Sequence, residues 1–175
     1  MRIKKSYTAL KWVAYILFAL FLFCLQSAPA RLGIFSDVLF LLPFAVALAS
    51  YEQMIPATIV SSVCGLFWDY SAQRVFGFHA LIMCVLCVAV ALIMKFYIRP
   101  VYISVVVAVA VSVMVYCLAD FFFFYVLRSY ENAGILLATE YLPAFLKTSV
   151  FGAGIAYLTE KIYRLSPIKA KFDNI

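Results

Sequence analysis

Two apolar runs separated by one short polar turn constrain this chain more than any other feature. Together they cover Ile55 to Leu86, and the polar turn between them covers 69–77. Apolar runs near the length that crosses a bilayer predict membrane helices. We therefore expect two membrane helices joined by a turn, called the central hairpin, and expect the rest of the chain to be organised around it.

The first helix of the central hairpin carries a stripe of small residues that ends in an acid. Ala57, Ser61, Gly65 and Asp69 follow one another at steps of four, and such steps stay on one face of a helix. Small side chains let a neighbouring backbone come close, which is how helices pack in lipid. The stripe predicts a close helix–helix contact, either within this chain or with a partner helix.

Composition assigns the chain to the membrane class. Of its 175 residues, 67% are hydrophobic and 13% are charged, whereas a soluble domain is about half apolar and about a quarter charged. A transmembrane barrel would show short alternating segments instead. The net charge of +6 is therefore expected to orient the chain in a lipid bilayer, and no nucleic-acid partner is expected.

The apolar runs predict an all-α bundle of six transmembrane helices in one domain, residues 1–165. The expected helices cover 8–26, 37–50, 54–68, 78–97, 101–127 and 141–163. Pro43 predicts a kink in the second helix. The most polar loop is expected at 128–140, and residues 166–175 are expected to form a cytoplasmic tail.

Lysine and arginine positions predict the orientation, because these residues collect on the cytoplasmic side. With six helices, both ends share one side. That side would hold Arg2, Lys4, Lys5, Lys11, Lys95, Arg99, Lys161, Arg164, Lys169 and Lys171, and the other would hold Arg31, Arg74, Arg128 and Lys147. Both termini are therefore expected in the cytoplasm. The basic N-terminus resembles a signal peptide, but we expect it to remain as an uncleaved first helix.

Two ionisable residues fall inside the last two predicted helices. Charges inside a bilayer are costly, so each needs a partner or a function. Asp120 lies eight residues before Arg128, and Lys147 lies six after Tyr141, which gives them similar depths. We hypothesise an ion pair between Asp120 and Lys147; the alternative is that each side chain reaches the outer interface separately.

No other pattern points to catalysis or to a bound group. The chain contains no H-E-x-x-H, no G-x-S-x-G and no phosphate-binding glycine loop. The single histidine, His79, is interpreted as a hydrogen-bonded cap or a surface residue at the interface. Cys84 and Cys87 form a C-x-x-C, but they lie in an apolar run and are interpreted as reduced packing residues. We expect no cofactor, no metal and no enzymatic activity.

A family resemblance covers nearly the whole chain. The segments GLFWD at 65–69 and FGFHAL at 76–81 resemble the G-L-x-x-D…G-x-x-A-L signature of the rod shape-determining protein family MreD. The segment CLQ at 24–26 is similar to that family's L-L-Q exit from the first helix. The family often has Arg-Pro before the second helix, where this chain has GIFSD at 33–37.

The resemblance implies a non-catalytic component of the bacterial cell-elongation machinery in the plasma (inner) membrane. Family members work with MreC, a protein with a single membrane helix that couples to cell-wall synthases, while MreB filaments lie in the cytoplasm. On this interpretation Gly65, Asp69 and the turn at Gly77 serve either the geometry of the bundle or the docking of MreC.

Two other function classes stay open. One is a substrate-binding S-component of an energy-coupling-factor vitamin transporter, a six-helix protein to which MreD is similar in fold. Such proteins dock through Ala-x-x-x-Ala faces, as at Ala45 and Ala49, and Asp120 and Lys147 would then lie near a small ligand. The other is an integral-membrane enzyme, which only the scattered acids favour.

Overall fold

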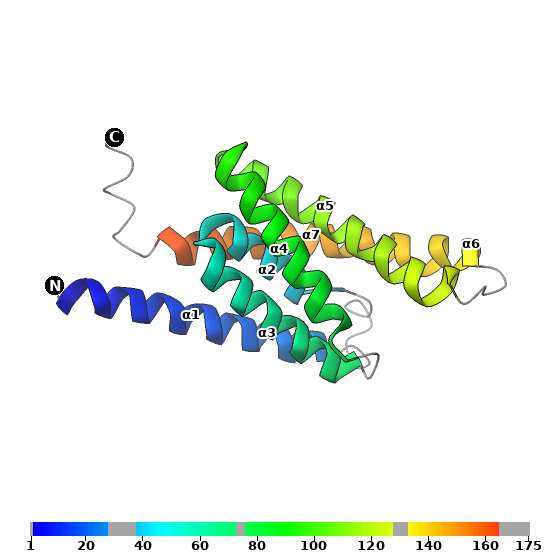
Figure 1. Cartoon of the computed structure of the whole chain (residues 1–175), viewed down its shortest axis with the longest axis horizontal. Coiled ribbons are helices and arrows are strands. Elements are labelled where there is room, and N and C mark those ends of the chain that lie inside the picture. The colour runs from blue at the N-terminus through cyan, green and yellow to red at the C-terminus, as the bar shows by residue number, and fades with distance from the viewer. Residues whose placement is uncertain (1, 28–37, 73–75, 128–132, 165–175) are drawn as a thin grey trace.

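The computed structural model describes residues 2–27, 38–72, 76–127 and 133–164, and in these residues it is helical with no strand (Figure 1). The elements are α1 (Arg2–Ser27), α2 (Leu41–Tyr51), α3 (Met54–Ala72), α4 (Phe78–Phe96), α5 (Tyr102–Phe121), η3 (Phe122–Val126), α6 (Ala133–Leu136), η4 (Leu137–Tyr141) and α7 (Leu142–Arg164). The two η elements are π-helical turns, which continue α5 and join α6 to α7. The prediction of an all-α chain is confirmed for the described residues.

Within the described residues, three helical stretches are long and apolar enough to cross a membrane. They are Leu10–Ser27, Phe78–Phe96 and Tyr102–Val126. Many of their large apolar side chains are exposed on the outside of the bundle, as at Ile16, Leu81 and Val107. In water such a surface would be costly, whereas lipid chains cover it. Their length and composition indicate a membrane protein.

The short helix α2 forms the core of the bundle. All eleven of its residues are buried, and it packs against α3, α4, α5 and α7 (Figure 1). A helix that is apolar on every side is stable only when other helices surround it. Ala45 and Ala49 lie inside this core, so their small side chains serve packing within the chain.

The beginning of α2 differs from the sequence-based expectation. The helix begins at Leu41, so Pro43 lies in its first turn instead of its interior. Backbone N–H groups in a first turn have no partner within the helix, and a proline there removes no hydrogen bond. The predicted kink is therefore not needed. Residues 28–37, where we placed the turn and the start of this helix, lie outside the described residues.

The expected polar loop at 128–140 is wrong for its second part. Residues 133–141 form α6 and η4, which lead directly into α7. Alanine, leucine and glutamate in this stretch are good helix formers, so the helix extends past its polar residues. The first part of that loop, 128–132, and the expected tail at 166–175 lie outside the described residues.

Candidate functional site: a buried polar network at the central hairpin

The central hairpin is formed by α3 and α4, which make the most extensive contact of any two described helices. Gly65 of α3 lies directly against the first turn of α4. A methyl group on Gly65 would come within 2.8 Å of the Ala80 backbone nitrogen and 3.1 Å of the His79 carbonyl carbon. Those atoms are backbone and cannot move aside cheaply, so this approach requires glycine.

Asp69 of α3 caps the N-terminus of α4, where the backbone N–H groups have no partner within their own helix. Its carboxylate accepts the backbone N–H of Gly77 at 2.9 Å, of His79 at 3.0 Å and of Ala80 at 3.3 Å. The N-cap itself is Gly77, which has φ = 92° and no side chain with which to cap. An acid at a helix N-terminus satisfies these amides and interacts favourably with the helix dipole.

The side chain of His79 extends the same network. Its Nδ1 lies 2.6 Å from Asp69 Oδ1, and its ring stacks on Trp68 with centroids 4.6 Å apart and an interplanar angle of 22°. Tyr116 of α5 lies at a tilt, with its ring centroid 5.9 Å from that of His79. The imidazole is therefore held by an acid at one edge and by aromatic rings along its faces.

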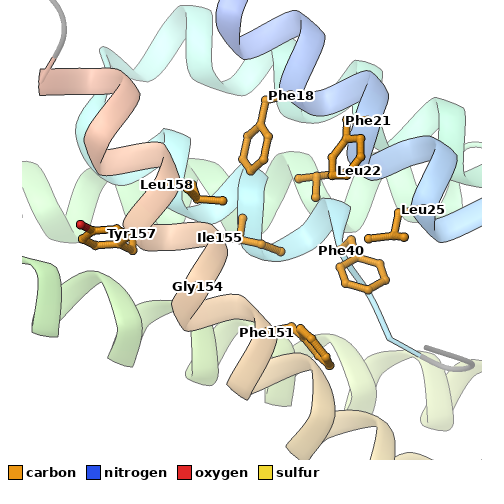
Figure 2. A pocket seen from close by; sticks show the side chains of 10 residues that line it. All are labelled: Phe18, Phe21, Leu22, Leu25, Phe40, Phe151, Gly154, Ile155, Tyr157 and Leu158. Carbon is orange, nitrogen blue, oxygen red and sulfur yellow. The ribbon is translucent and has the colours of Figure 1, made fainter. Parts of the chain in front are cut away.

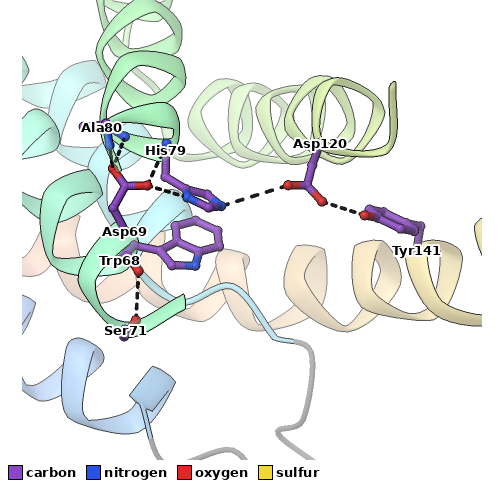
Figure 3. A network of polar contacts seen from close by, with 8 residues as sticks. Trp68, Asp69, Ser71, His79, Ala80, Asp120 and Tyr141 are labelled. Carbon is purple, nitrogen blue, oxygen red and sulfur yellow. Dashed lines mark hydrogen bonds and ion pairs between the residues drawn. The ribbon is translucent and has the colours of Figure 1, made fainter. Parts of the chain in front are cut away.

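Asp120 continues the network into α5 and η4, as Figure 3 shows. Its Oδ2 accepts the hydroxyl of Tyr141 at 2.5 Å, and its Oδ1 lies 4.0 Å from His79 Nε2. The exposed fractions are 2% for Asp69, 1% for His79 and 4% for Asp120. Side chains from α3, α4, α5 and η4 thus form one polar network, in which Asp69, His79 and Asp120 are buried and Tyr141 is half-buried.

The structure does not bring together the predicted pair of Asp120 and Lys147. Among the ion pairs between described residues, none joins these two side chains. Asp120 meets Tyr141 instead. Six residues separate Tyr141 from Lys147, which places their side chains about 120° apart around an α-helix. Similar depth in a membrane therefore does not give contact, because Lys147 of α7 and Tyr141 of η4 leave the continuous helix in different directions.

The predicted small-residue stripe on α3 faces the inside of this chain. Ala57, Ser61, Gly65 and Asp69 are all buried. The Ser61 hydroxyl donates to the Ala57 carbonyl at 2.8 Å, which satisfies it without a second helix. Of the two roles that the sequence left open for these residues, the geometry supports packing within the bundle.

Of the two interpretations of His79, the surface residue is wrong, since its side chain is buried. His79 is nevertheless hydrogen-bonded, as one of the two interpretations proposed. The contact between Asp69 and His79 could have been predicted from the hairpin. Asp69 lies near the end of one helix and His79 near the start of the next, so their side chains meet across the turn. No comparable signal pointed to the contacts of Asp120 with His79 and Tyr141, because these residues lie far from Asp120 in the sequence.

A second side chain, which is half-buried, caps a helix from outside it. Gln26, near the end of α1, accepts the backbone N–H groups of Phe40 and Leu41 through Oε1, each at 3.0 Å. These amides lie at the N-terminus of α2. Gln26 therefore does for α2 what Asp69 does for α4.

An ion pair ties α1 to the bundle near the start of its membrane-length stretch, Leu10–Ser27. Lys11 Nζ lies 2.7 Å from Glu52 Oε1, and the Tyr15 hydroxyl donates to the same oxygen at 3.0 Å. Lys11 also lies over the ring of Tyr163, 5.6 Å from its centroid. Polar contacts thus hold α1 near both ends of its membrane-length stretch.

An apolar groove of about 410 Å³ opens between α1 and α7 (Figure 2). It is lined by Phe18, Phe21, Leu22, Leu25, Phe40, Phe151, Gly154, Ile155, Tyr157 and Leu158. These side chains offer almost no hydrogen-bonding groups, so the groove suits hydrocarbon better than a polar small molecule.

The described residues contain no group of three or more His, Cys, Asp or Glu side chains placed to hold a metal ion. The cysteines are free thiols, and Cys64, Cys87 and Cys117 are buried. No family model matches this chain, and neither a curated protein nor a solved structure matches it.

Proposed function

We propose that this chain is a non-catalytic membrane scaffold of the MreD type in the bacterial cell-elongation machinery. It would bind an MreC-like single-span protein and help to couple cytoplasmic MreB filaments to the synthases that build peptidoglycan. In this role the chain supplies a rigid helical surface in the plasma membrane, and the chemistry of wall synthesis belongs to its partners.

One observation carries the proposal. The three segments that resemble the family, at 24–26, 65–69 and 76–81, each supply a contact that sets how neighbouring helices meet. Gln26 caps α2. Asp69 and Gly65 of the second segment meet the backbone of the third, at Gly77 and Ala80. Residues with these roles determine a shape, which is what a scaffold needs.

The proposed topology has six membrane spans with both termini in the cytoplasm. In its support, the first residues of α1 and the last residues of α7 lie at the same end of the bundle (Figure 1). Reporter fusions that are active only in the cytoplasm, placed at each terminus and after Phe76, test this. Activity at both termini but not after Phe76 is expected; activity on opposite sides for the two termini would contradict the topology.

The function is tested by purifying the tagged full-length protein from its own cells in a mild detergent and identifying the bound proteins by mass spectrometry. Recovery of an MreC-like protein and cell-wall synthases is the expected result. Recovery of ATPase subunits with a transmembrane coupling protein would replace the proposal with an S-component function. Purification of a folded protein with no bound partner would contradict both the scaffold function and the S-component function.

Variants separate loss of shape from loss of a docking surface. Asp69→Ala removes the cap of α4 and should reduce partner recovery together with the unfolding temperature. Tyr70→Phe, at the exposed neighbouring residue, is the matched control and should change neither. Reduced recovery with an unchanged unfolding temperature in Asp69→Ala would instead assign this residue a direct role in docking.

A further inference from the structure

The apolar groove between α1 and α7 has a buried floor and an exposed rim. Leu22 and Ile155 are buried, whereas Phe21, Tyr157 and Leu158 are exposed. Figure 2 shows the side chains of α1 on one side of the groove and those of α7 on the other. In a membrane the rim meets lipid, so a hydrocarbon chain can enter the groove from the side.

The length of the groove suits a hydrocarbon chain of one leaflet. Its lining runs from Phe18 to Leu25 on α1 and from Phe151 to Leu158 on α7. Seven residue steps on each helix span about 10 Å at the standard rise. One leaflet is about half of a hydrocarbon core that is about 30 Å thick. A single acyl chain therefore matches the groove, whereas a membrane-spanning helix of a partner is much longer than it.

A hydroxyl group and a positive charge lie at one end of the groove. Among the ten lining residues, Tyr157 alone carries a polar side-chain group. Lys161 follows one turn later on α7 and is exposed. Its side chain leaves the helix about 40° from Tyr157 and about 60° from Leu158, so it lies on the face that lines the groove. The groove is therefore apolar along its length and cationic at one end.

The charge of Lys161 is available to a ligand. Among the ion pairs between described residues, none includes Lys161. The neighbouring acid, Glu160, pairs with Arg164 instead. A lysine near a helix end lays its methylene groups along apolar surface and holds its ammonium group at the level of the lipid headgroups. Charge complementarity therefore selects an anionic headgroup at this end of the groove.

We propose that the groove binds one acyl chain of an anionic phospholipid, whose phosphate pairs with Lys161. The lipid belongs to the leaflet that faces the end of α7. Lipids elsewhere around the bundle touch a convex surface, whereas this chain is held between two helices. It fills the space between α1 and α7 and so helps to hold α1 on the bundle. The site depends on the membrane location of the chain and not on its partner proteins.

Native mass spectrometry of the full-length protein in a non-ionic detergent tests this proposal. The protein is titrated with dioleoyl phosphatidylglycerol and, separately, with dioleoyl phosphatidylcholine, which has the same acyl chains and no net charge. We expect the first phosphatidylglycerol to bind about fivefold more tightly than the first phosphatidylcholine, the effect of one lysine near a membrane surface. Equal affinities for the two lipids would overturn the proposal.

A lysine variant tests the headgroup contact. Lys161→Gln should abolish the preference for phosphatidylglycerol and leave the affinity for phosphatidylcholine unchanged. Lys95→Gln removes an exposed lysine of α4, equal in charge but outside the groove, and should keep the fivefold preference. A preference that survives in Lys161→Gln would overturn the assignment of this residue.

A glycine variant tests the acyl-chain site. Gly154 lines the groove, and a methyl group there meets nothing within 4 Å, so Gly154→Leu should fill the groove and weaken the binding of both lipids. Val150→Leu, at an exposed residue of α7 outside the groove, is the matched control and should change neither affinity. Undiminished lipid binding in a folded Gly154→Leu protein would overturn the site.

The same spectra report whether a second copy of this chain occupies the groove. A wild-type dimer that Gly154→Leu converts to a monomer, with no change in lipid affinity, would overturn the lipid site in favour of self-association. The lipid preference of the wild-type protein and its loss in Lys161→Gln decide the proposal even if Gly154→Leu does not fold.

Discussion

At the scale of single residues, the central hairpin depends on two positions of α3, Gly65 and Asp69. Gly65 lacks a side chain where the backbone of α4 passes, and Asp69 carries an acid where that helix begins. The two lie one turn apart on α3 and act on consecutive parts of the same turn of α4. Close approach and capping therefore support each other, since the cap is reachable only because Gly65 lets α4 come near.

Gly65→Ala should destabilise the protein by about 1–3 kcal/mol, the usual cost of overpacking. The new methyl group would meet the Ala80 backbone nitrogen at 2.8 Å. Gly154→Ala is the matched control, because a methyl group there meets nothing within 4 Å. Thermal unfolding followed by tryptophan fluorescence measures both, and Trp68 reports on the hairpin itself. Equal unfolding temperatures for the two variants would refute the close-packing explanation.

At the scale of elements, α2 is the surface on which the other helices meet, and α7 contacts it through a second glycine. A methyl group on Gly152 would lie 2.8 Å from Val109 Cγ1 of α5 and 3.3 Å from Pro43 of α2. Here the nearest atom belongs to a side chain, unlike the backbone atoms that face Gly65. The junction of α2, α5 and α7 is therefore tight but open to compensation.

Gly152→Ala should destabilise the bundle by about 1–3 kcal/mol, and Val109→Ala should partly restore the loss by removing the clashing methyl group. We expect the double variant to be more stable than the sum of the single losses, with a coupling of about 0.5–3 kcal/mol. A double-mutant cycle of unfolding free energies in detergent measures this coupling. Strict additivity would show that the two residues do not meet.

At the scale of the whole molecule, α1 is the most loosely attached long helix. Only 11% of its membrane-length stretch is buried, compared with the complete burial of α2. Polar contacts at Gln26 and between Lys11 and Glu52 hold the two ends of that stretch. The apolar groove lies beside α1 and α7, so any movement of α1 changes the width of the groove.

Gln26→Ala should loosen α1 and the start of α2 before the rest of the bundle. It leaves the amides of Phe40 and Leu41 without their acceptor, at a cost of about 1–3 kcal/mol for each buried group. Hydrogen–deuterium exchange should rise in peptides from α1 and α2 and stay unchanged in α4. Gln53→Ala, at an exposed glutamine, is the control. A uniform rise across all helices would contradict this local attachment.

The helical class, the apolar lengths and the central hairpin with Gly65 and Asp69 could be predicted from the amino-acid sequence. These follow from the 3.6-residue period and from the composition of each run, which are local properties. Three features depend on how the helices pack: the central place of α2, the burial of His79, and the contact of Asp120 with Tyr141 instead of Lys147. Periodicity states which residues share a face of a helix. Which faces meet depends on how helices distant in sequence rotate and cross when they pack, and on which glycines let them approach.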